Sequence, residues 1–81
     1  MLQVSLTGSL RSAAGGAEVI EIEAGTIREL MAKIVERYPA MNQHFDSGIA
    51  VAINGEIYRD NWDVEIAADS EVFLLPRIPG G

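Results

Sequence analysis

The residues of this sequence that could do chemistry stand at its C-terminal end, in the stretch Arg77-Ile78-Pro79-Gly80-Gly81. Pro76 and Pro79 fix their own φ angles and favour extended backbone in the residues before them. The two glycines carry no Cβ, so a partner's pocket could close tightly around bare backbone. Residues 76–81 could span about 20 Å when extended, at about 3.3 Å per residue. The pattern predicts a flexible tail, 76–81, that carries the Gly81 α-carboxylate into a partner's active site.

The residues that such an active site would bind are Pro76, Arg77, Ile78, Pro79 and Gly80. The alternative interpretation of the same stretch is a frayed chain end with two incidental glycines.

The rest of the chain is poor in residues that catalyse reactions. It has no cysteine, which excludes disulfides, zinc–thiolate sites and a thiol nucleophile. Its one histidine, His44, has no neighbour of the right type to act with as a base or ligand, so we interpret it as a surface or loop residue. We therefore expect no metal site, no bound cofactor and no catalysis by this chain alone.

Length and charge limit the class of partner. With 81 residues, 48% of them hydrophobic, the chain is expected to form one folded domain. A net charge of −6 argues against nucleic acid and anionic membranes and favours a protein partner with a basic face. No signal peptide or membrane span is visible, so we expect a cytoplasmic protein.

The elements that must position the tail are marked by their periodicity. Residues 2–7 and 19–23 alternate apolar and polar side chains, which predicts two strands in an antiparallel hairpin, with a helical turn at 10–14 between them. Thr26 and Glu29 have the spacing of a capping box. The apolar stripe that follows predicts a helix from Ile27 to Tyr38 that covers one face of a sheet.

The second half of the chain returns to strands. Residues 40–48 are expected to be irregular, with Phe45 filling the core beneath them. Residues 49–53 and 56–58 form a predicted hairpin around Asn54-Gly55, and 71–75 is the last strand. Between them, 60–68 is a brief strand or an inward-packing turn, with Trp62 as a partly buried lid.

This order of elements predicts an α+β fold. We expect one domain over 1–81, with a mixed sheet of four to five strands and one main helix on one face, the β-grasp arrangement. The first and last strands are expected to be parallel neighbours at its centre. If Val72 and Leu74 face the helix, Phe73 and Leu75 face outward beside the tail, which is typical of a docking patch.

Three further motifs accompany the Pro-x-x-Pro-Gly-Gly end. They are Leu10-Arg11 followed by Gly15-Gly16, the hairpin Ile53-Asn54-Gly55-Glu56, and the turn Ala68-Asp69-Ser70-Glu71-Val72. With these motifs the chain resembles the ubiquitin-like sulfur carriers of the MoaD/ThiS family across nearly its whole length.

The resemblance implies a function in three steps. A partner similar to ubiquitin-activating enzymes uses Mg-ATP to adenylate the carboxylate of Gly81. Sulfur from a persulfide donor replaces AMP and leaves a thiocarboxylate. A sulfur-accepting synthase subunit then takes the sulfur. The resemblance also implies partner contacts at Arg11, Ile57 and Leu75, to which the strand alternation adds Phe73.

The acceptor is left open by the sequence. The small subunit of molybdopterin synthase, which serves molybdenum cofactor biosynthesis, is the first choice by frequency. Leu74-Leu75-Pro76-Arg77 replaces the Phe-Phe-Pro-Pro common in those subunits, so a carrier for cysteine, thiamine or another thio-metabolite is the alternative. A ubiquitin-like protein modifier conjugated through Gly81 is a second alternative, and a small binding domain without terminal chemistry is a third.

Overall fold

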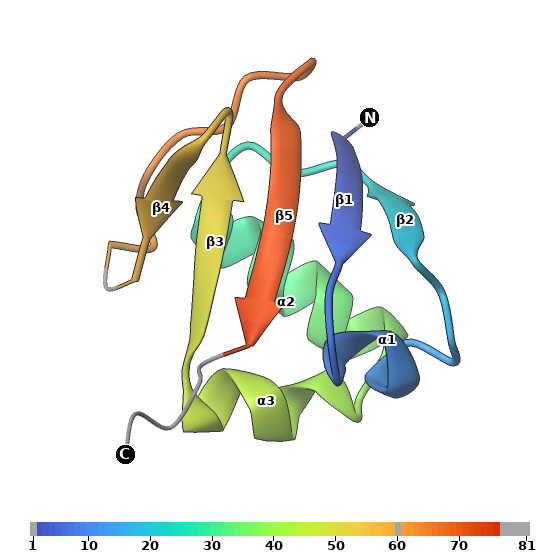
Figure 1. Ribbon diagram of the computed structural model, residues 1–81. Helices are drawn as coiled ribbons and strands as arrows, with labels where there is room; N and C mark the ends of the chain where they lie inside the picture. The colour runs from blue at the N-terminus through green and yellow to red at the C-terminus, as the bar shows by residue number, and fades with distance from the viewer. Residues whose placement is uncertain (1, 60, 77–81) are drawn as a thin grey trace.

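The computed structural model describes residues 2–59 and 61–76. It contains a five-stranded sheet with helices on one face and at one end (Figure 1). The elements in chain order are β1 (Leu2–Leu6), α1 (Leu10–Ala13), β2 (Val19–Ile22), α2 (Ile27–Arg37), α3 (Met41–Ser47), β3 (Ile49–Ile53), β4 (Glu56–Tyr58) and β5 (Glu71–Pro76).

The last strand lies in the middle of the sheet. The strand order is β2-β1-β5-β3-β4, and β5 runs parallel to β1 and antiparallel to β3. The β1–β2 and β3–β4 pairs are antiparallel hairpins. This arrangement confirms the expected β-grasp fold, including the parallel central pair. The strand that leads into the tail is therefore held on both sides by main-chain hydrogen bonds.

Alternation along the strands separates the two faces of the sheet. In β1 and β5 the buried residues are Leu2, Val4 and Leu6, and Val72 and Leu74. They pack beneath α2, whose inward stripe of Ile27, Leu30 and Ile34 is fully buried. Burying each such side chain stabilises the fold by about 1.5–3 kcal/mol. The core thus lies between the sheet and α2, and within residues 2–59 and 61–76 the opposite face of the sheet carries no helix (Figure 1).

The start of α2 follows the predicted capping box with one change. The Thr26 hydroxyl accepts a hydrogen bond from the Glu29 amide at 3.2 Å. The Glu29 carboxylate reaches back to the amide of Gly25 at 2.6 Å, one residue earlier than in the standard box. The helix ends at Arg37, and Tyr38 before Pro39 is its C-cap.

The expectation of irregular chain over 40–48 is wrong, because residues 41–47 form α3. Met41 is fully buried and Phe45, four residues on, packs half-buried against the core. These two contacts hold a helix that has no side-chain cap and few strong helix formers. His44 consequently lies half-buried on this helix and not in a loop.

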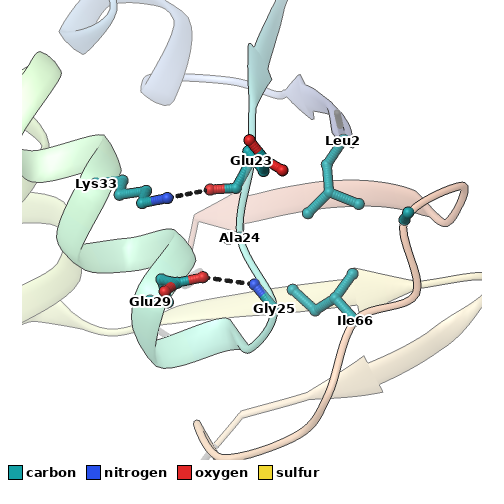
Figure 2. Close-up of a pocket in the computed structure, with 8 residues that line it drawn as sticks. Leu2, Glu23, Ala24, Gly25, Glu29, Lys33 and Ile66 are labelled. Atoms are coloured by element: carbon teal, nitrogen blue, oxygen red, sulfur yellow. Dashed lines mark hydrogen bonds between the residues drawn. The ribbon is translucent and has the colours of Figure 1, made fainter.

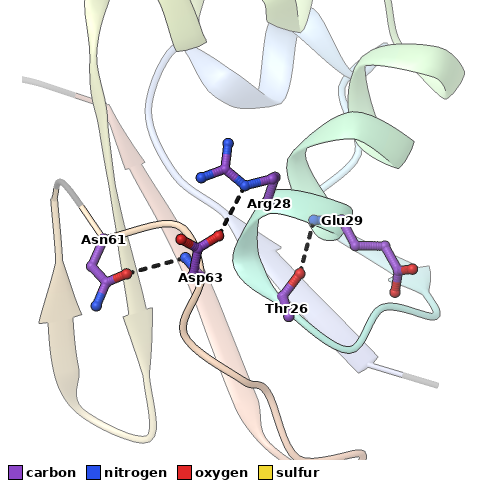
Figure 3. Close-up of polar contacts among 5 residues, drawn as sticks. All are labelled: Thr26, Arg28, Glu29, Asn61 and Asp63. Atoms are coloured by element: carbon purple, nitrogen blue, oxygen red, sulfur yellow. Dashed lines mark hydrogen bonds and ion pairs between the residues drawn. The ribbon is translucent and has the colours of Figure 1, made fainter.

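The segment between β4 and β5 packs inward on the start of α2, as one of the two expected forms. The Trp62 carbonyl accepts from the Arg28 amide at 2.7 Å, and Ile66 is buried. The Arg28 side chain pairs with Asp63 at 3.0 Å (Figure 3). Trp62 is half-buried and packs against the core, which confirms the expected partial burial.

Two basic side chains of α2 cover the outer edge of β2. The Lys33 ammonium donates to the Glu23 carbonyl at 2.6 Å, and the Arg37 guanidinium donates to the Glu21 carbonyl at 2.9 Å. Four helix residues rise about 6 Å and two strand residues about 6.8 Å, so the two spacings match. The Leu6 amide bonds the Glu18 carbonyl, so by the alternation of an antiparallel pair residues 20 and 22 also bond to β1, and the carbonyls of 21 and 23 point to the free side.

No helix within the described ranges has the length and apolar character needed to cross a membrane.

Candidate functional site

The end of β5 is held by the loop that follows β1. The Thr7 hydroxyl donates to the Leu74 carbonyl at 3.0 Å. Gly8 takes a left-handed φ of +56°, and a Cβ there would lie 3.3 Å from the Pro76 Cγ. Pro76 is the last residue of β5, paired with Ile49. The loop and β3 together fix the direction in which the chain leaves the sheet.

The start of β5 is held by the β3–β4 turn. Asn54 has a φ of +50°, which asparagine tolerates well. Its side-chain oxygen accepts a hydrogen bond from the main-chain amide of Glu71 at 2.9 Å. Its main-chain amide donates to the Glu71 carbonyl, also at 2.9 Å. Its side-chain nitrogen lies 3.4 Å from the buried Ser70 hydroxyl. The Asn-Gly turn therefore makes a hairpin and also anchors the strand that carries the tail.

The helix-free face of the sheet carries a row of side chains that crosses all five strands and is apolar except for Ser5. The register pairs Val19 with Ser5, Ser5 with Phe73, Phe73 with Ala52, and Ala52 with Ile57. Val19 and Ile57, at the two ends, are 51% and 54% exposed and are the large hydrophobic residues most open to solvent in the described chain. Phe73 is half-buried between them. We call this set the apolar row.

The predicted contact residues gather around this row. Ile57 and Phe73 belong to it, and Leu75 lies half-buried on the same face, opposite Ala50. Arg11 is exposed on α1, and its Nε donates to the Leu6 carbonyl at 3.1 Å, at the end of β1. Ile57, Phe73 and Leu75 thus lie on the face opposite α2, and Arg11 lies at the end of β1, next to the end of β5. Their role in partner binding stays a prediction.

One step toward the start of β5, the same face is acidic. Gln3 pairs with Glu21 on one side and with Glu71 on the other. All three residues are exposed. Like carboxylates two strands apart make this end of the face negative. We call these residues the acidic row.

The described residues hold no reactive cluster. Within 2–59 and 61–76, no group of three or more His, Cys, Asp or Glu side chains could hold a metal ion. A pocket beside α2 is lined by Glu23, Gly25, Glu29, Lys33 and Ile66, among others (Figure 2). Two of its charged side chains are already engaged, because Glu29 binds the Gly25 amide and Lys33 binds the Glu23 carbonyl. The pocket is therefore part of the helix–strand join.

One ionisable group in this part of the chain departs from its ordinary behaviour. The Tyr58 hydroxyl donates to the Glu56 carboxylate at 2.6 Å. That hydrogen bond, then burial, then the carboxylate's charge raise the pKa of Tyr58 above 10.0. The pair fixes the short strand β4 beside Ile57, and it offers no acid or base near neutral pH.

The predicted tail contacts Arg77, Ile78, Pro79 and Gly80, and the reactive Gly81, lie outside the described residues.

Comparison with known families shows the family of this chain. The ThiS family matches residues 4–81, from within β1 to the Gly-Gly end. The chain belongs to the ThiS family. This confirms the resemblance to MoaD/ThiS sulfur carriers. No sequence among the curated proteins matches it.

Solved structures share the fold of this ThiS-family chain at low identity. A chain of the Amycolatopsis orientalis BexX/CysO complex superposes with a TM-score of 0.82 at 21% identity, covering 100% of both chains. SAMP1 from Haloferax volcanii gives 0.76 at 22%, covering 99% of this chain and 98% of that one. The complex of subunits 1 and 2 of molybdopterin-converting factor from Helicobacter pylori gives 0.70 at 24%, covering 99% and 97%. These likenesses establish the fold and leave the acceptor undecided.

Sequence reasoning missed two parts of the site. Thr7 and Gly8 hold the end of β5 across more than 65 residues of chain, which no local pattern signals. The alternating pattern places Val19 in a strand, but its place at the end of the apolar row needs the register. One signal could have found it, because Val19 is the apolar residue on the otherwise charged face of that strand.

Proposed function

We propose that this ThiS-family chain is a sulfur carrier whose C-terminal carboxylate, on Gly81, is adenylated and then converted to a thiocarboxylate. The observation that carries the proposal is the family match, which runs through the last strand to Gly81. The described fold supports it, because β5 is clamped at both ends and the helix-free face has an apolar row for a partner. The chain itself supplies a folded domain for the partner to bind and, at Gly81, the acyl group.

The chemistry follows from the weakness of a carboxylate as an acyl donor. An activating enzyme that resembles those of ubiquitin supplies Mg-ATP, and attack of the carboxylate on the α-phosphate releases pyrophosphate. The terminal sulfur of a persulfide donor then attacks the acyl carbon and displaces AMP, which leaves an acyl disulfide. A thiol reduces its S–S bond, which releases the thiocarboxylate and leaves the donor and the thiol joined as a disulfide. The acyl-adenylate must be shielded from water, and a tail without side chains at its end lets the enclosing channel close tightly. A step that consumes ATP fits the cytoplasmic location expected from the sequence.

For the acceptor, we propose molybdopterin synthase first, with this chain as its sulfur-donating small subunit. A carrier for cysteine, thiamine or another thio-metabolite is the alternative. Two of the neighbours were solved in complexes, BexX/CysO and subunits 1 and 2 of molybdopterin-converting factor, which supports a synthase partner in general. SAMP1, named a small archaeal modifier protein, keeps conjugation through Gly81 as a second candidate.

Intact-protein mass spectrometry tests the proposal. Incubation with the cognate activating enzyme, ATP, a persulfide donor and a thiol reductant should raise the mass by about 16 Da, because sulfur replaces one oxygen of the activated carboxyl group. Omitting ATP should leave the mass unchanged. A chain that lacks Gly81 should also stay unchanged while keeping the thermal stability of the parent. A parent mass that never moves with any such enzyme from the same organism would refute the carrier function.

A further inference from the structure

We propose that Thr7, Gly48 and Pro76 form a strand stop, which ends β5 at Pro76 and fixes the point from which the C-terminal tail starts. Within this strand stop, Thr7 is a positioning residue for the adenylation of Gly81. The inference rests on the proposed function and adds the residues that set how the tail is offered to the activating enzyme.

On the side of β1, the main-chain groups that would lengthen β5 are engaged elsewhere. Continued with the same register, the parallel ladder would bond the Thr7 amide to the Leu74 carbonyl and the amide of residue 76 to the Thr7 carbonyl. Instead, the Thr7 hydroxyl donates to the Leu74 carbonyl at 3.0 Å, and the Thr7 carbonyl accepts from the Leu10 amide at 3.2 Å, at the start of α1. Residue 76 is a proline and has no amide hydrogen. The ladder with β1 therefore ends at the Leu74 carbonyl.

On the side of β3, the amide that would lengthen β5 is used by a helix. Pro76 is in register with Ile49, so the next partner along β3 would be Gly48. The Gly48 amide donates instead to the carbonyls of His44 and Phe45, at 3.1 and 3.2 Å, and so ends α3. Both α1 and α3 lie at the end of the sheet where β5 ends (Figure 1). Each of them takes a main-chain group that a longer β5 would need.

Thr7 binds the last peptide group of β5 that is held from both sides. This group joins Leu74 to Leu75, and its oxygen accepts from the Thr7 hydroxyl. The peptide is trans, so its N–H points the opposite way, toward β3, where Leu75 is in register with Ala50. Loss of the hydroxyl would release one side of this group, and the chain would leave the sheet over a wider range of directions. Binding of the tail would then cost more conformational entropy, which raises KM.

The test makes the same substitution at two threonines. Thr7→Val keeps the shape of the side chain and removes the hydroxyl, whereas Thr7→Ser keeps the hydroxyl. Thr26→Val is the matched control, because it removes the hydroxyl that accepts from the Glu29 amide at the start of α2. Amide hydrogen exchange of the free protein is measured as the rate at Leu75 relative to the rate at Phe73 on the same strand, so that a general loss of stability cancels. Pyrophosphate release with the cognate activating enzyme gives kcat and KM.

For Thr7→Val we expect the exchange ratio of Leu75 to Phe73 to rise about tenfold, because the end of β5 loses one hydrogen bond. We expect KM to rise about threefold with kcat unchanged, because the enzyme holds the tail once it is bound. Thr7→Ser should keep the parent's exchange ratio and KM. Thr26→Val should lower the thermal midpoint through the lost helix cap and leave both quantities unchanged.

Three results would overturn the inference. An unchanged exchange ratio in Thr7→Val would show that the hydroxyl does not hold β5. A raised ratio with the parent's KM would show that the strand stop does not serve adenylation, and equal rises of KM in Thr7→Val and Thr26→Val would show that stability alone acts. Failure of the parent to be adenylated at all would instead refute the proposed function, while the exchange ratios would still decide whether Thr7 holds the end of β5.

Discussion

Gly8 and Pro76 meet where β5 ends, and their contact is the residue-level feature that most directly serves the tail. A side chain at residue 8 would need a left-handed backbone, at a cost of about 1–2 kcal/mol. It would also press on the Pro76 ring, from which its Cβ would lie 3.3 Å. Gly15 has a similar φ of +70°, but a Cβ added there would meet nothing within 4 Å. A substitution at either glycine would strain the backbone, but only one at Gly8 would also press on Pro76.

We expect Gly8→Ala to lower the free energy of unfolding by about 1–2 kcal/mol and also to raise the KM for adenylation, because the exit of the tail shifts. Gly15→Ala should show a similar loss of stability and a normal KM. Urea denaturation and steady-state adenylation kinetics measure the two effects. Equal KM values for the two variants would mean that the Pro76 contact does not guide the tail.

The Tyr58–Glu56 pair gives a second prediction at this scale. In the folded protein the neutral phenol donates to the carboxylate, so the pKa of Tyr58 is raised above 10.0. The resulting stabilisation is present below pH 10 and is lost as the pH rises through the folded-state pKa. Glu56→Gln should bring the pKa back toward its ordinary value, as measured by ultraviolet titration of the tyrosines. An unchanged titration would show that the hydrogen bond is absent in solution.

Local patterns predicted some of these residue contacts and could not predict others. Thr26 with Glu29, and Asn54 with Gly55, are signalled within four residues of sequence, and both interactions are present. The contact of Gly8 with Pro76 joins the two ends of the chain and exists only because β1 and β5 pair. Its prediction would require the register of the sheet.

At the scale of elements, neighbouring leucines of β5 face opposite sides of the sheet. Leu74 is fully buried and Leu75 is half-buried on the helix-free face. The period-two alternation predicted this division. The helix α3 escaped prediction because its hold on the core comes from only two side chains, Met41 and Phe45, and the residues between them give no apolar stripe.

We expect Leu75→Glu to weaken adenylation while changing the thermal midpoint little, because the side chain lies beside the apolar row. Leu74→Ala is the control, and it should cost about 2–5 kcal/mol of stability through a cavity in the core. Thermal melts and kcat/KM on both variants separate the two roles. A loss of stability at Leu75 as large as that at Leu74 would make Leu75 a core residue.

At the scale of the whole molecule, the sheet holds β5 at its centre, and the sequence 76–81 gives the length needed to enter a partner's active site. The prolines of 76–81 restrict the unbound tail, and ordering each backbone residue costs about 1–2 kcal/mol. Pro79→Gly should therefore leave the fold intact and raise KM for adenylation modestly. Gly80→Val should have a larger effect, because its side chain would clash in a narrow channel. If Gly80→Val reacts as well as the parent in steady-state kinetics, a bare-backbone tail is not required.

The two basic side chains of α2 on the edge of β2 also bear on how the protein avoids aggregation. An uncovered edge is a template on which a foreign strand can grow, and extended strand-to-strand growth leads to aggregates. Lys33 and Arg37 occupy the Glu23 and Glu21 carbonyls, the acceptors such a strand would need there. These contacts obstruct the addition of a foreign strand at this edge. Such addition uses main-chain hydrogen bonds alone and therefore discriminates poorly between proteins. Binding at the sheet is thereby left to side chains, which can tell one partner from another.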